Sequence, residues 1–366
     1  MGASPVREMV IQSHRGPYRL ALARPFEGLD RGLAEDEHLI IDARVASIYR
    51  RPLDAALAGC SVLALEAAEA NKSLERFPDY AAHLIERGIR RNHTLVAVGG
   101  GIIQDIAAFL AGTLLRGLAW RFYPTTLLAQ TDSCIGSKSS VNVGPYKNQL
   151  GTFTPPVEIS LSPKVLASLP EADMRSGIGE MIKAHLLSSV ADARALAAAY
   201  PRLQKDPEAL AQRLWRSLEI KKRLIEIDEF DRRERLVMNY GHTFGHALES
   251  ASAYQIPHGI AVTIGLDMAN RLSERLGLAE PNAFEELQPM IENNYAGFER
   301  VAIPEEPFFA ALLKDKKNSD RQARFVLLKA PGEPVLKSLT IDDDFREFCR
   351  GYFHRLREKA ASGTRA

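Results

Sequence analysis

Short apolar runs rich in β-branched residues recur through the first hundred positions of the chain, and stretches with a helical spacing of apolar residues separate them. These runs predict strands at Tyr18–Ala23, His38–Ile41, Ser61–Leu65 and Leu95–Val98. Strands that alternate with helices are typical of a mostly parallel α/β sheet, whose ligands bind at the carboxyl ends of the strands. The pattern therefore predicts an N-terminal α/β domain with a Rossmann-like sheet.

From about Ser162 onward the apolar spacing becomes that of helices. A chain of 366 residues is long for a single core, so we expect two domains: an α/β domain at residues 1–162 and an α-helical domain at residues 163–366. One β-like run, Phe325–Leu328, falls within the second domain. The predicted helices are Lys164–Leu169, Ala172–Val190, Ala191–Tyr200, Pro207–Phe230, Arg235–Ser252, His258–Leu276 and Ala283–Tyr295.

The stretch Arg116–Pro156 is polar and rich in glycine and serine, and it is too long for an ordinary connection. A solvated loop is one interpretation. Loops of this length also carry function, and Lys138, Lys147 and Asn148 lie here among small residues. Such side chains would suit a phosphate or a carboxylate. We therefore predict a long binding loop.

Composition excludes several classes of protein. The 47 basic and 46 acidic residues leave a net charge of +1, which argues against recruitment of nucleic acid or an anionic membrane by a global field. Cys60, Cys134 and Cys349 are scattered and lack C-x-x-C spacing, as expected in a reducing compartment. The longest apolar run, Ile106–Leu115, is too short to span a bilayer, and no apolar signal core is present. A cytoplasmic enzyme or binding protein is expected.

Polar residues and glycines follow three of the predicted strands. Asp42 closes one strand, where its carboxylate could accept hydrogen bonds from a ribose, and Glu69 and Lys72 follow the next. Gly99–Gly101 lie between a strand and the predicted helix Asp105–Leu115, so the backbone could approach a pyrophosphate at a helix N-terminus. Glycines at strand ends also make ordinary turns, and the G-x-G-x-x-G fingerprint is missing. These positions predict a dinucleotide site.

Three histidines are concentrated in the segment Arg235–His258. His242 and His246 are four residues apart and so share one face of a helix, and His258 follows a turn at Pro257. The segment predicts either a metal site or an acid/base group. Ordinary half-buried helices also carry histidines at this spacing, so a matching acidic ligand would be decisive.

Glu180 is the candidate for that acidic ligand. It lies beside Gly177 and Gly179 in the predicted helix Ala172–Val190, and small residues allow another group to approach. Lys183 follows it at a spacing that usually indicates a surface ion pair. The residues alone leave both interpretations open.

With one carboxylate and two imidazoles in place, the chain resembles the dehydroquinate synthases and, more broadly, the sugar phosphate cyclases. The resemblance runs from about Asp42 to Leu328, and the order and spacing of its segments make it specific. These segments are G-G-G-x-x-x-D at Gly99–Asp105, R-G at Arg116, P-T-T-L-L-A-Q-x-D-S at Pro124–Ser133, K-N at Lys147, G-x-x-E-x-I-K at Gly177–Lys183, N-Y-G-H-T-F-G-H-A-L-E at Asn239–Glu249, H-G at His258 and D-K-K at Asp315.

The resemblance implies that Glu180, His242 and His258 bind a catalytic divalent metal, zinc or alternatively cobalt. It places His246 beside the substrate's phosphate and not on the metal. It also implies a homodimer in which Arg116 reaches the neighbouring subunit's site, and a phosphate contact from Lys316 or Lys317. Further matches to catalytic or substrate-binding positions are Asp132, Lys138, Lys147, Asn148, Lys183, Lys221, Arg235 and Asn239.

The same resemblance implies bound NAD. In the family, NAD transiently oxidises a seven-carbon sugar phosphate, phosphate is eliminated, the ketone is reduced again and an intramolecular aldol step closes the ring. Dehydroquinate synthases serve the shikimate pathway of aromatic amino acid biosynthesis. The positions that match the NAD site are Asp42, Glu69, Lys72, Gly99, Gly100, Gly101, Asp105, Thr125 and Thr126.

Family members differ in whether their substrate bears a carboxylate. Lys221, Arg235 and Asn239 match the positions associated with that group, which favours 3-deoxy-arabino-heptulosonate 7-phosphate. Ser137 and Gln104 depart from the usual pattern, as do Ala108 and the sequence V-G-P-Y-K-N, so an amino-substituted analogue or sedoheptulose 7-phosphate is an alternative. A metal-dependent NAD polyol dehydrogenase and a non-catalytic metal- or nucleotide-binding protein are alternatives from other classes.

Overall fold

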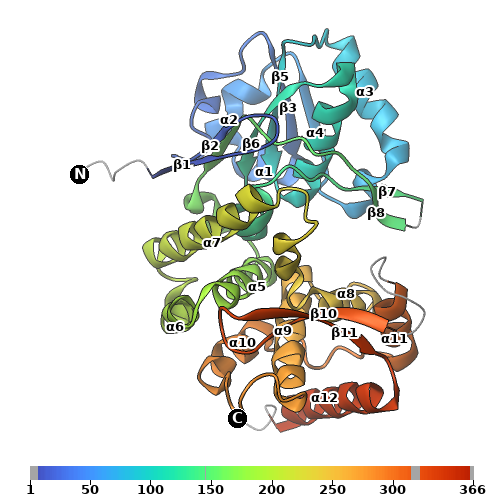
Figure 1. The fold of residues 1–366 in the computed structure, drawn as a ribbon. Helices are drawn as coiled ribbons and strands as arrows, with labels where there is room; N and C mark the ends of the chain where they lie inside the picture. Colours follow the sequence, from blue (N-terminus) through green and yellow to red (C-terminus); the bar gives the residue numbers. More distant parts are fainter. Residues whose placement is uncertain (1–6, 145, 315–321, 363–366) are drawn as a thin grey trace. The chain divides into compact units, whose positions relative to one another are not determined.

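The computed structural model describes residues 7–144, 146–314 and 322–362. Its contacts divide the chain into two compact units (Figure 1). Unit 1 consists of Met1–Pro170 and Lys221–Asp231, and unit 2 consists of Glu171–Ile220 and Arg232–Ala366. The predicted boundary at residue 162 stays a prediction. The units show in addition that a segment distant in sequence, Lys221–Asp231, belongs with the N-terminal part of the chain.

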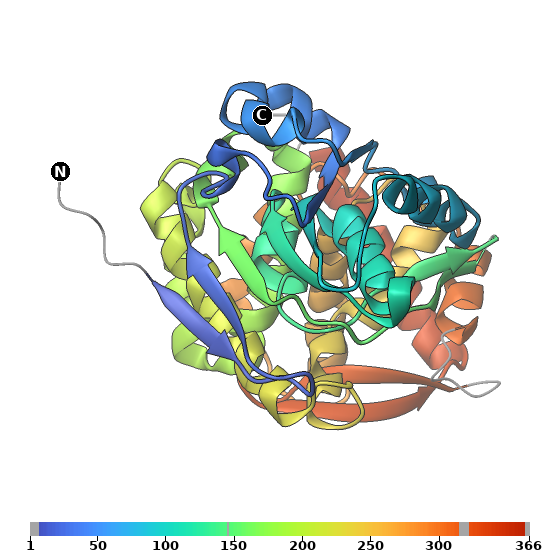
Figure 2. The same ribbon diagram turned by 90° about the horizontal axis from the view of Figure 1, so that it is seen from above.

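Unit 1 is built on a seven-stranded sheet. Six neighbouring strands are parallel, and β1 pairs antiparallel with β2 in a hairpin at one edge (Figure 2). The central strands β3 and β5 are buried almost throughout, which explains their continuous apolar sequences. The predicted parallel α/β sheet is thus confirmed. Its spatial order is β1 (Glu8–Ile11), β2 (Tyr18–Leu22), β9 (Glu158–Leu161), β6 (Ala119–Pro124), β5 (Thr94–Gly99), β3 (Glu37–Asp42) and β4 (Val62–Leu65).

The direction of winding in this sheet reverses between β3 and β5. The chain passes from β3 to β4 on one side, and then returns to place β5 on the other side of β3, followed by β6 and β9. In open α/β sheets a crevice forms at such a reversal, outside the carboxyl ends of the strands. The carboxyl ends of β3 and β5 carry Asp42 and Gly99.

Helices flank the strands of unit 1. They are α1 (Ala43–Ile48), α2 (Arg50–Leu57), α3 (Phe77–Glu86) and α4 (Gly101–Thr113). Leu53 and Ala56 of α2 share one apolar core with Leu39 of β3 and Val96 of β5. Helix α4 begins four residues before the predicted Asp105, so Gly101 lies in its first turn.

The prediction of a long loop at Arg116–Pro156 was wrong. The stretch contains the central strand β6, a π-helical turn at Ala129–Ser133, and a small hairpin of β7 (Val141–Val143) and β8 (Tyr146–Leu150). Arg121 obscured the strand in the sequence because a charged residue is unexpected in the middle of a sheet. Here it forms ion pairs with Glu37 of β3 and Glu158 of β9. These pairs compensate the guanidinium charge and allow it to lie within the sheet.

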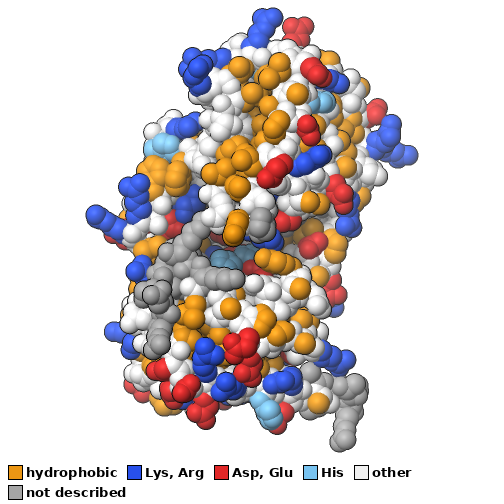
Figure 3. All heavy atoms as spheres, turned by 90° about the vertical axis from the view of Figure 1, so that its right-hand side faces the viewer, with side chains coloured by type: hydrophobic (Ala, Val, Ile, Leu, Met, Phe, Trp, Pro, Cys, Tyr) orange, Lys and Arg blue, Asp and Glu red, His pale blue; other side chains and the backbone are white. Residues whose placement is uncertain are grey.

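Unit 2 is mainly helical, as predicted, and one hairpin is added to the helices. Among the described residues no helix is both long and apolar enough to cross a membrane. On the face drawn in Figure 3, basic and acidic side chains are intermixed, in keeping with the small net charge. The elements are α5 (Glu171–Ser188), α6 (Val190–Ala199), the first part of α7 (Pro207–Ile227), α8 (His242–Ala251), α9 (His258–Arg275), α10 (Gln288–Tyr295), α11 (Glu305–Lys314), α12 (Asp343–Ser362), and the hairpin β10 (Gln322–Leu328) and β11 (Pro334–Thr340).

The predicted helix Arg235–Ser252 is broken in two. A 3₁₀ helix, η8, covers Glu234–Asn239, and α8 begins only at His242. Between them Gly241 has a left-handed backbone with φ of 76°, which other residues adopt only at a cost. The break makes His242 the first residue of a helix.

Glycines allow α5, α8 and α9 to pack with their backbones in close contact. A β-carbon on Gly179 of α5 would lie 2.1 Å from the carbonyl oxygen of Gly259 on α9. One on Gly259 would lie 1.8 Å from that of Ser176, and one on Gly265 would lie 2.1 Å from that of Gly241. Because no side chain fits at these distances, the glycines set the spacing of the three helices.

Helix α5 is the central helix of unit 2, since all of its residues from Ser176 to Leu187 are buried. Its polar residues therefore need partners inside the unit. His185 is fully buried, and its Nδ1 donates a hydrogen bond to the carbonyl of Met181 at 2.8 Å. Burial lowers the pKa of His185 to about 4, so the ring is neutral at physiological pH.

Substitution of Gly259 by alanine should destabilise unit 2 by at least about 1–3 kcal/mol, because the new β-carbon would overlap backbone that side-chain movement cannot displace. Gly351→Ala is the matched control. Gly351 lies in α12, and outside its own helix turn no atom of the described residues lies within 4 Å of the position that a β-carbon would take, so alanine should stabilise the helix by about 0.5–1 kcal/mol. Urea unfolding followed by circular dichroism measures both effects. Equal stability of the two variants would contradict the close packing.

The free energy of unfolding should fall between pH 7 and pH 5 by about 2 kcal/mol through His185 alone. Its pKa is depressed in the folded state, so its contribution is complete above about pH 6.5 and is lost as the pH falls toward 4. His185→Gln should flatten this part of the pH profile, as measured by urea unfolding at both pH values. An unchanged slope in the variant would show that His185 does not take up the proton.

Candidate functional site

Glu180, His242 and His258 come together in unit 2, one from each of the three closely packed helices. Oε1 of Glu180 lies 3.5 Å from Nε2 of His242 and 3.2 Å from Nε2 of His258. His242 and His258 are the first residues of α8 and α9, while Glu180 lies in the middle of α5. One ligand atom from each residue lies within 4.8 Å of the others, a spacing at which they could hold a metal ion.

The remaining ring nitrogens of both histidines also have acceptors. Nδ1 of His242 donates to the carbonyl of Tyr240 at 3.2 Å. Nδ1 of His258 faces Oε2 of Glu249 at 3.1 Å. A hydrogen bond from Nδ1 leaves the Nε2 lone pair for a metal. Both imidazoles are therefore oriented as ligands, with Nε2 toward Glu180.

Glu180 and Lys183 form a buried ion pair, so the alternative of a surface pair was wrong. Glu180 is 2% exposed and Lys183 is equally buried, and the ammonium group contacts Oε2. Burial favours a raised pKa for Glu180, but the charge of Lys183 and the neighbouring histidines outweigh it and hold the pKa well below its ordinary value. Glu180 is thus ionised.

The histidines respond differently to this environment. Burial and the charge of Lys183 lower the pKa of His242 well below its ordinary value. Burial also opposes protonation of His258, but its contacts with the carboxylates of Glu180 and Glu249 prevail and raise its pKa to about 10. Two carboxylates on either side of this ring therefore favour a positive charge between them.

These residues fit a divalent metal. Both carboxylate oxygens of Glu180 are buried and accept no well-formed hydrogen bond from the described residues, although Lys183 is in ion-pair contact. A buried carboxylate without hydrogen bonds raises the free energy of the folded protein. A cation bound to its oxygens would compensate this desolvation. One carboxylate with two imidazoles is also a ligand set of catalytic zinc sites, which keep a position open for substrate.

His246 is not part of this group, and the expectation that it does not bind the metal stays a prediction. It is exposed on α8, with its ring centroid 5.3 Å from that of His242 and 5.8 Å from that of His258. His246, Glu249 and His258 form a second group whose atoms lie within 4.8 Å of one another. Both groups contain His258. They are therefore alternative sites for one metal ion, unless the two ring nitrogens of His258 bind two ions.

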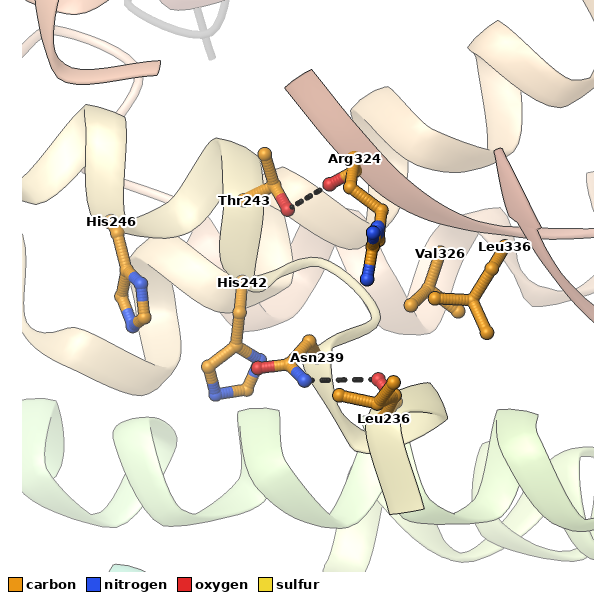
Figure 4. Close-up of a pocket in the computed structure, with 8 residues that line it drawn as sticks. All are labelled: Leu236, Asn239, His242, Thr243, His246, Arg324, Val326 and Leu336. Atoms are coloured by element: carbon orange, nitrogen blue, oxygen red, sulfur yellow. Dashed lines mark hydrogen bonds between the residues drawn. The ribbon is translucent and has the colours of Figure 1, made fainter. Parts of the chain in front are cut away.

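A shallow pocket, open to solvent, adjoins the histidines (Figure 4). Asn239, His242 and His246 line one part of it, and the hairpin contributes Arg324, whose side chain extends into the pocket. The hydroxyl of Thr243 donates to the carbonyl of Arg324 at 2.9 Å and ties the hairpin to α8. The remaining lining residues are Leu236, Val326 and Leu336.

Sequence reasoning missed the contribution of this hairpin. It identified Phe325–Leu328 only as a β-like run. Strand alternation does place Arg324 and Val326 on one face, with Leu336 opposite Val326, but no signal in the sequence links that face to α8. Lys316 and Lys317, the predicted phosphate contacts, lie outside the described residues.

The predicted carboxylate-binding residues of unit 2 lie on η8. Arg235 is buried, and the side-chain amide of Asn239 donates to the carbonyl of Leu236 at 2.9 Å. Only Asn239 of the two lines the pocket. Lys183, also predicted to bind substrate, lies beside Glu180.

In unit 1, predicted NAD-binding residues lie at the carboxyl ends of adjacent parallel strands. Asp42 ends β3 and caps α1 by accepting from the amide of Arg44 at 2.9 Å, and burial raises its pKa. The carbonyl of Gly99 at the end of β5 accepts from Thr125, which follows β6. A β-carbon on Gly100 would lie 2.8 Å from Thr126. Gly101 differs from its neighbours, since no atom of the described residues beyond its own helix turn and chain neighbours lies within 4 Å of its β-carbon position, so a ligand could approach it.

The buried side chain of Lys72 joins several predicted residues of unit 1. Its ammonium group lies 3.0 Å from Asp105, 2.9 Å from the side-chain oxygen of Asn148 and 3.6 Å from Glu69. Burial raises the pKa of Asp105, against the opposing charge of Lys72. Asn142, which donates to Glu69 at 2.8 Å, was not predicted, because in sequence it is one polar residue among many in its stretch.

The other predicted substrate residues of unit 1 lie in several separate places. Some of them form ion pairs and others are exposed. Lys221 is buried and lies 2.7 Å from the carboxylate of Asp132, whose backbone carbonyl it also contacts. Lys138 lies 2.6 Å from Asp231. Lys147 is exposed on β8, and Arg116 is exposed in a left-handed backbone conformation with φ of 66°. The structure therefore brings Lys221 and Asp132 together and leaves Arg116 on the surface of unit 1.

Comparison with known proteins agrees with a parallel-sheet unit and a helical unit that could hold a metal. Residues 62–176 match the family model of the 3-dehydroquinate synthase N-terminal region, and residues 177–318 match that of its C-terminal region. A 3-dehydroquinate synthase of Cereibacter sphaeroides is 37% identical over 305 residues, which cover 80% of this chain and 82% of that protein.

Two solved structures have the same fold. A 2-epi-5-epi-valiolone synthase from Streptomyces hygroscopicus, with NAD+ and Zn2+ bound, has a TM-score of 0.79 and 25% identity over 93% of this chain and 97% of that one. A 2-deoxy-scyllo-inosose synthase in complex with carbaglucose-6-phosphate, NAD+ and Co2+ also has a TM-score of 0.79, with 21% identity over 93% and 98%.

Fold and sequence together define a sugar phosphate cyclase. The chain belongs to the 3-dehydroquinate synthase family. It is an enzyme of the carbon–oxygen lyase type, a cyclase that eliminates phosphate.

Metal retention should separate the two candidate ligand groups. After equilibration with Zn2+ and desalting, Glu180→Gln and His242→Ala should lose the bound ion, because each removes a ligand from a three-residue set. His246→Ala should keep it. Elemental analysis of the protein measures the ratio of metal to chain. Loss of the ion in His246→Ala with retention in Glu180→Gln would instead identify the group of His246, Glu249 and His258.

Proposed function

We propose that this enzyme converts 3-deoxy-arabino-heptulosonate 7-phosphate to 3-dehydroquinate, with NAD bound to unit 1 and a divalent metal, zinc, bound to unit 2. The observation that carries the proposal is the group of Glu180, His242 and His258 beside a pocket lined by polar and cationic side chains. The 37% identity to a protein named 3-dehydroquinate synthase supports the choice of reaction. The solved relatives with NAD and zinc or cobalt support the choice of cofactors.

The chemistry requires oxidation beside a leaving phosphate. When bound, the metal would polarise the reacting hydroxyl and NAD would accept and return a hydride. The ionised carboxylate of Glu180 and the Nε2 atoms of His242 and His258 would hold the metal. Asn239 and His246 offer hydrogen-bond donors in the adjoining pocket, and Arg324 offers a fixed positive charge to an anionic group of the substrate.

The basic residues favour a substrate with a carboxylate. Arg235 is only 8% exposed and, like Asn239, matches a position associated with the substrate's carboxylate. Lys221 supports the same choice less strongly, since Asp132 already compensates its charge. Sedoheptulose 7-phosphate, which lacks the carboxylate, is therefore the less favoured substrate.

One departure from the usual synthase sequence is accounted for by internal packing. Gln104 on α4 is buried, and its amide donates to the carbonyl of Ser133 at 2.6 Å and accepts from the Ser133 hydroxyl at 2.6 Å. These two hydrogen bonds of Gln104 stabilise the π-helical turn that carries Asp132. This role is compatible with the ordinary substrate and does not by itself require an analogue.

The proposal also includes a homodimer, a cytoplasmic location and a role in the shikimate pathway. Exposure of Arg116 on unit 1 is compatible with a contact to the neighbouring subunit of a homodimer. The cytoplasm and the shikimate pathway are the setting that goes with the proposed reaction. The family match favours the cyclase over a polyol dehydrogenase or a non-catalytic binding protein.

Phosphate release from three substrates, measured side by side, tests the reaction. With NAD and Zn2+ supplied, the carboxylated heptulosonate phosphate should be turned over with a kcat/KM at least on the order of 100-fold above that for sedoheptulose 7-phosphate, because a cationic site built for a carboxylate penalises a substrate that lacks one. Absorbance at 340 nm should stay flat, since NAD is regenerated. Preference for sedoheptulose 7-phosphate or an amino-substituted analogue would refute the substrate, and steady NADH formation from a polyol would refute the cyclase.

Arg235→Gln should selectively lower kcat/KM for the carboxylated substrate and reduce its advantage over sedoheptulose 7-phosphate. Arg233→Gln is the control, since Arg233 is exposed two residues earlier in the chain and should leave both values unchanged. Steady-state phosphate release gives kcat/KM for each variant with each of the two substrates. An equal loss for both substrates in Arg235→Gln would assign this residue a structural role.

A further inference from the structure

We infer that Glu249 is a positioning residue for the metal centre, which fixes the ring of His258 by accepting a hydrogen bond from its Nδ1. This inference rests on the proposed function, because it requires Glu180, His242 and His258 to be the metal ligands. Neither the family resemblance nor the comparisons assign Glu249 a role. The residue closes the sequence Asn239–Glu249, in which His242 and His246 are the obvious chemical groups.

The geometry places Glu249 behind the ligand and not beside the ion. His258 presents Nε2 to Glu180 at 3.2 Å and Nδ1 to Glu249 at 3.1 Å. The two nitrogens lie on opposite sides of an imidazole ring, so a cation at Nε2 leaves the Nδ1 proton for Glu249. The Glu249 side chain is only 15% exposed, which limits competition from water for this hydrogen bond.

The alternative role, as a ligand in the group with His246 and His258, is less consistent with the contacts. In that arrangement Glu180 would remain deep in the unit with buried oxygens that lack a well-formed hydrogen bond among the described residues. Glu249 has no such deficit, because His258 supplies a donor. His246 would have to act as a ligand from an exposed position. A metal at Glu180 therefore satisfies more of the buried polar atoms.

The two ligand histidines differ in how they are held. His242 donates to the backbone carbonyl of Tyr240, a partner that no side-chain substitution removes. His258 donates to a carboxylate, which orients the ring and also makes it a stronger electron donor. Glu249 lies on α8 and His258 on α9, so this contact joins two helices that the glycines have already brought together.

The test measures metal affinity without substrate. Wild type, Glu249→Ala, Glu249→Gln and the control Glu274→Gln on the far part of α9 are titrated with Zn2+ or Co2+ against a chelator of known affinity. Loss of a hydrogen-bond partner behind a ligand typically costs about 10–100-fold in metal affinity, and we expect that loss in Glu249→Ala. Glu249→Gln should lose less, because its amide oxygen still accepts from Nδ1. Glu274→Gln should match wild type.

Absorption of the Co2+ form separates positioning from ligation. All variants of Glu249 should keep the wild-type band pattern once saturated, since the three ligands remain. A changed pattern, or loss of metal as complete as in Glu180→Gln, would make Glu249 a ligand and overturn the inference. An unchanged affinity with a lower unfolding midpoint would assign it a purely structural role and would also overturn it. Failure of wild type to retain either ion would refute the proposed metal centre itself, a result distinct from both.

Discussion

The close backbone contact of α5, α8 and α9 is the constraint on which unit 2 depends. At Gly179, Gly259 and Gly265 there is no room for even a methyl group. This spacing brings three residues that are far apart in sequence, Glu180, His242 and His258, to within a few ångströms of one another. The helices are thus rigid supports, and the glycines determine the distance between the three side chains that could hold a metal.

Electrostatic interactions then determine the protonation states of Glu180 and His242. Glu180 is buried, which by itself would favour a neutral carboxyl group, but Lys183 one turn away on α5 keeps it ionised. The same lysine opposes protonation of His242. A single buried ammonium group therefore prepares a carboxylate and a neutral imidazole, the forms in which both residues can bind a cation.

Much of the molecule could be predicted from local patterns. The parallel strands with Asp42 and Gly99 at their ends follow from alternation of strands and helices, whereas the set of Glu180, His242 and His258 was implied by the family resemblance. Errors arose where tertiary contacts override local signals. Strand β6 was hidden by Arg121, whose charge is acceptable only because strands distant in sequence supply glutamates. The hairpin residue Arg324 reaches the pocket through a contact with α8 that no spacing in the sequence encodes.

The break at Gly241 has a further consequence for the chemistry of the cluster. It makes His242 the first residue of α8, just as Pro257 makes His258 the first residue of α9. Two helix macrodipoles therefore present their positive ends to the same small volume. Their combined field stabilises negative charge on an oxygen bound within it, while Glu180 and Glu249 still favour a proton on His258. The two helix ends thus prepare this volume for a negatively charged oxygen of a ligand, beside the carboxylate that would attract a cation.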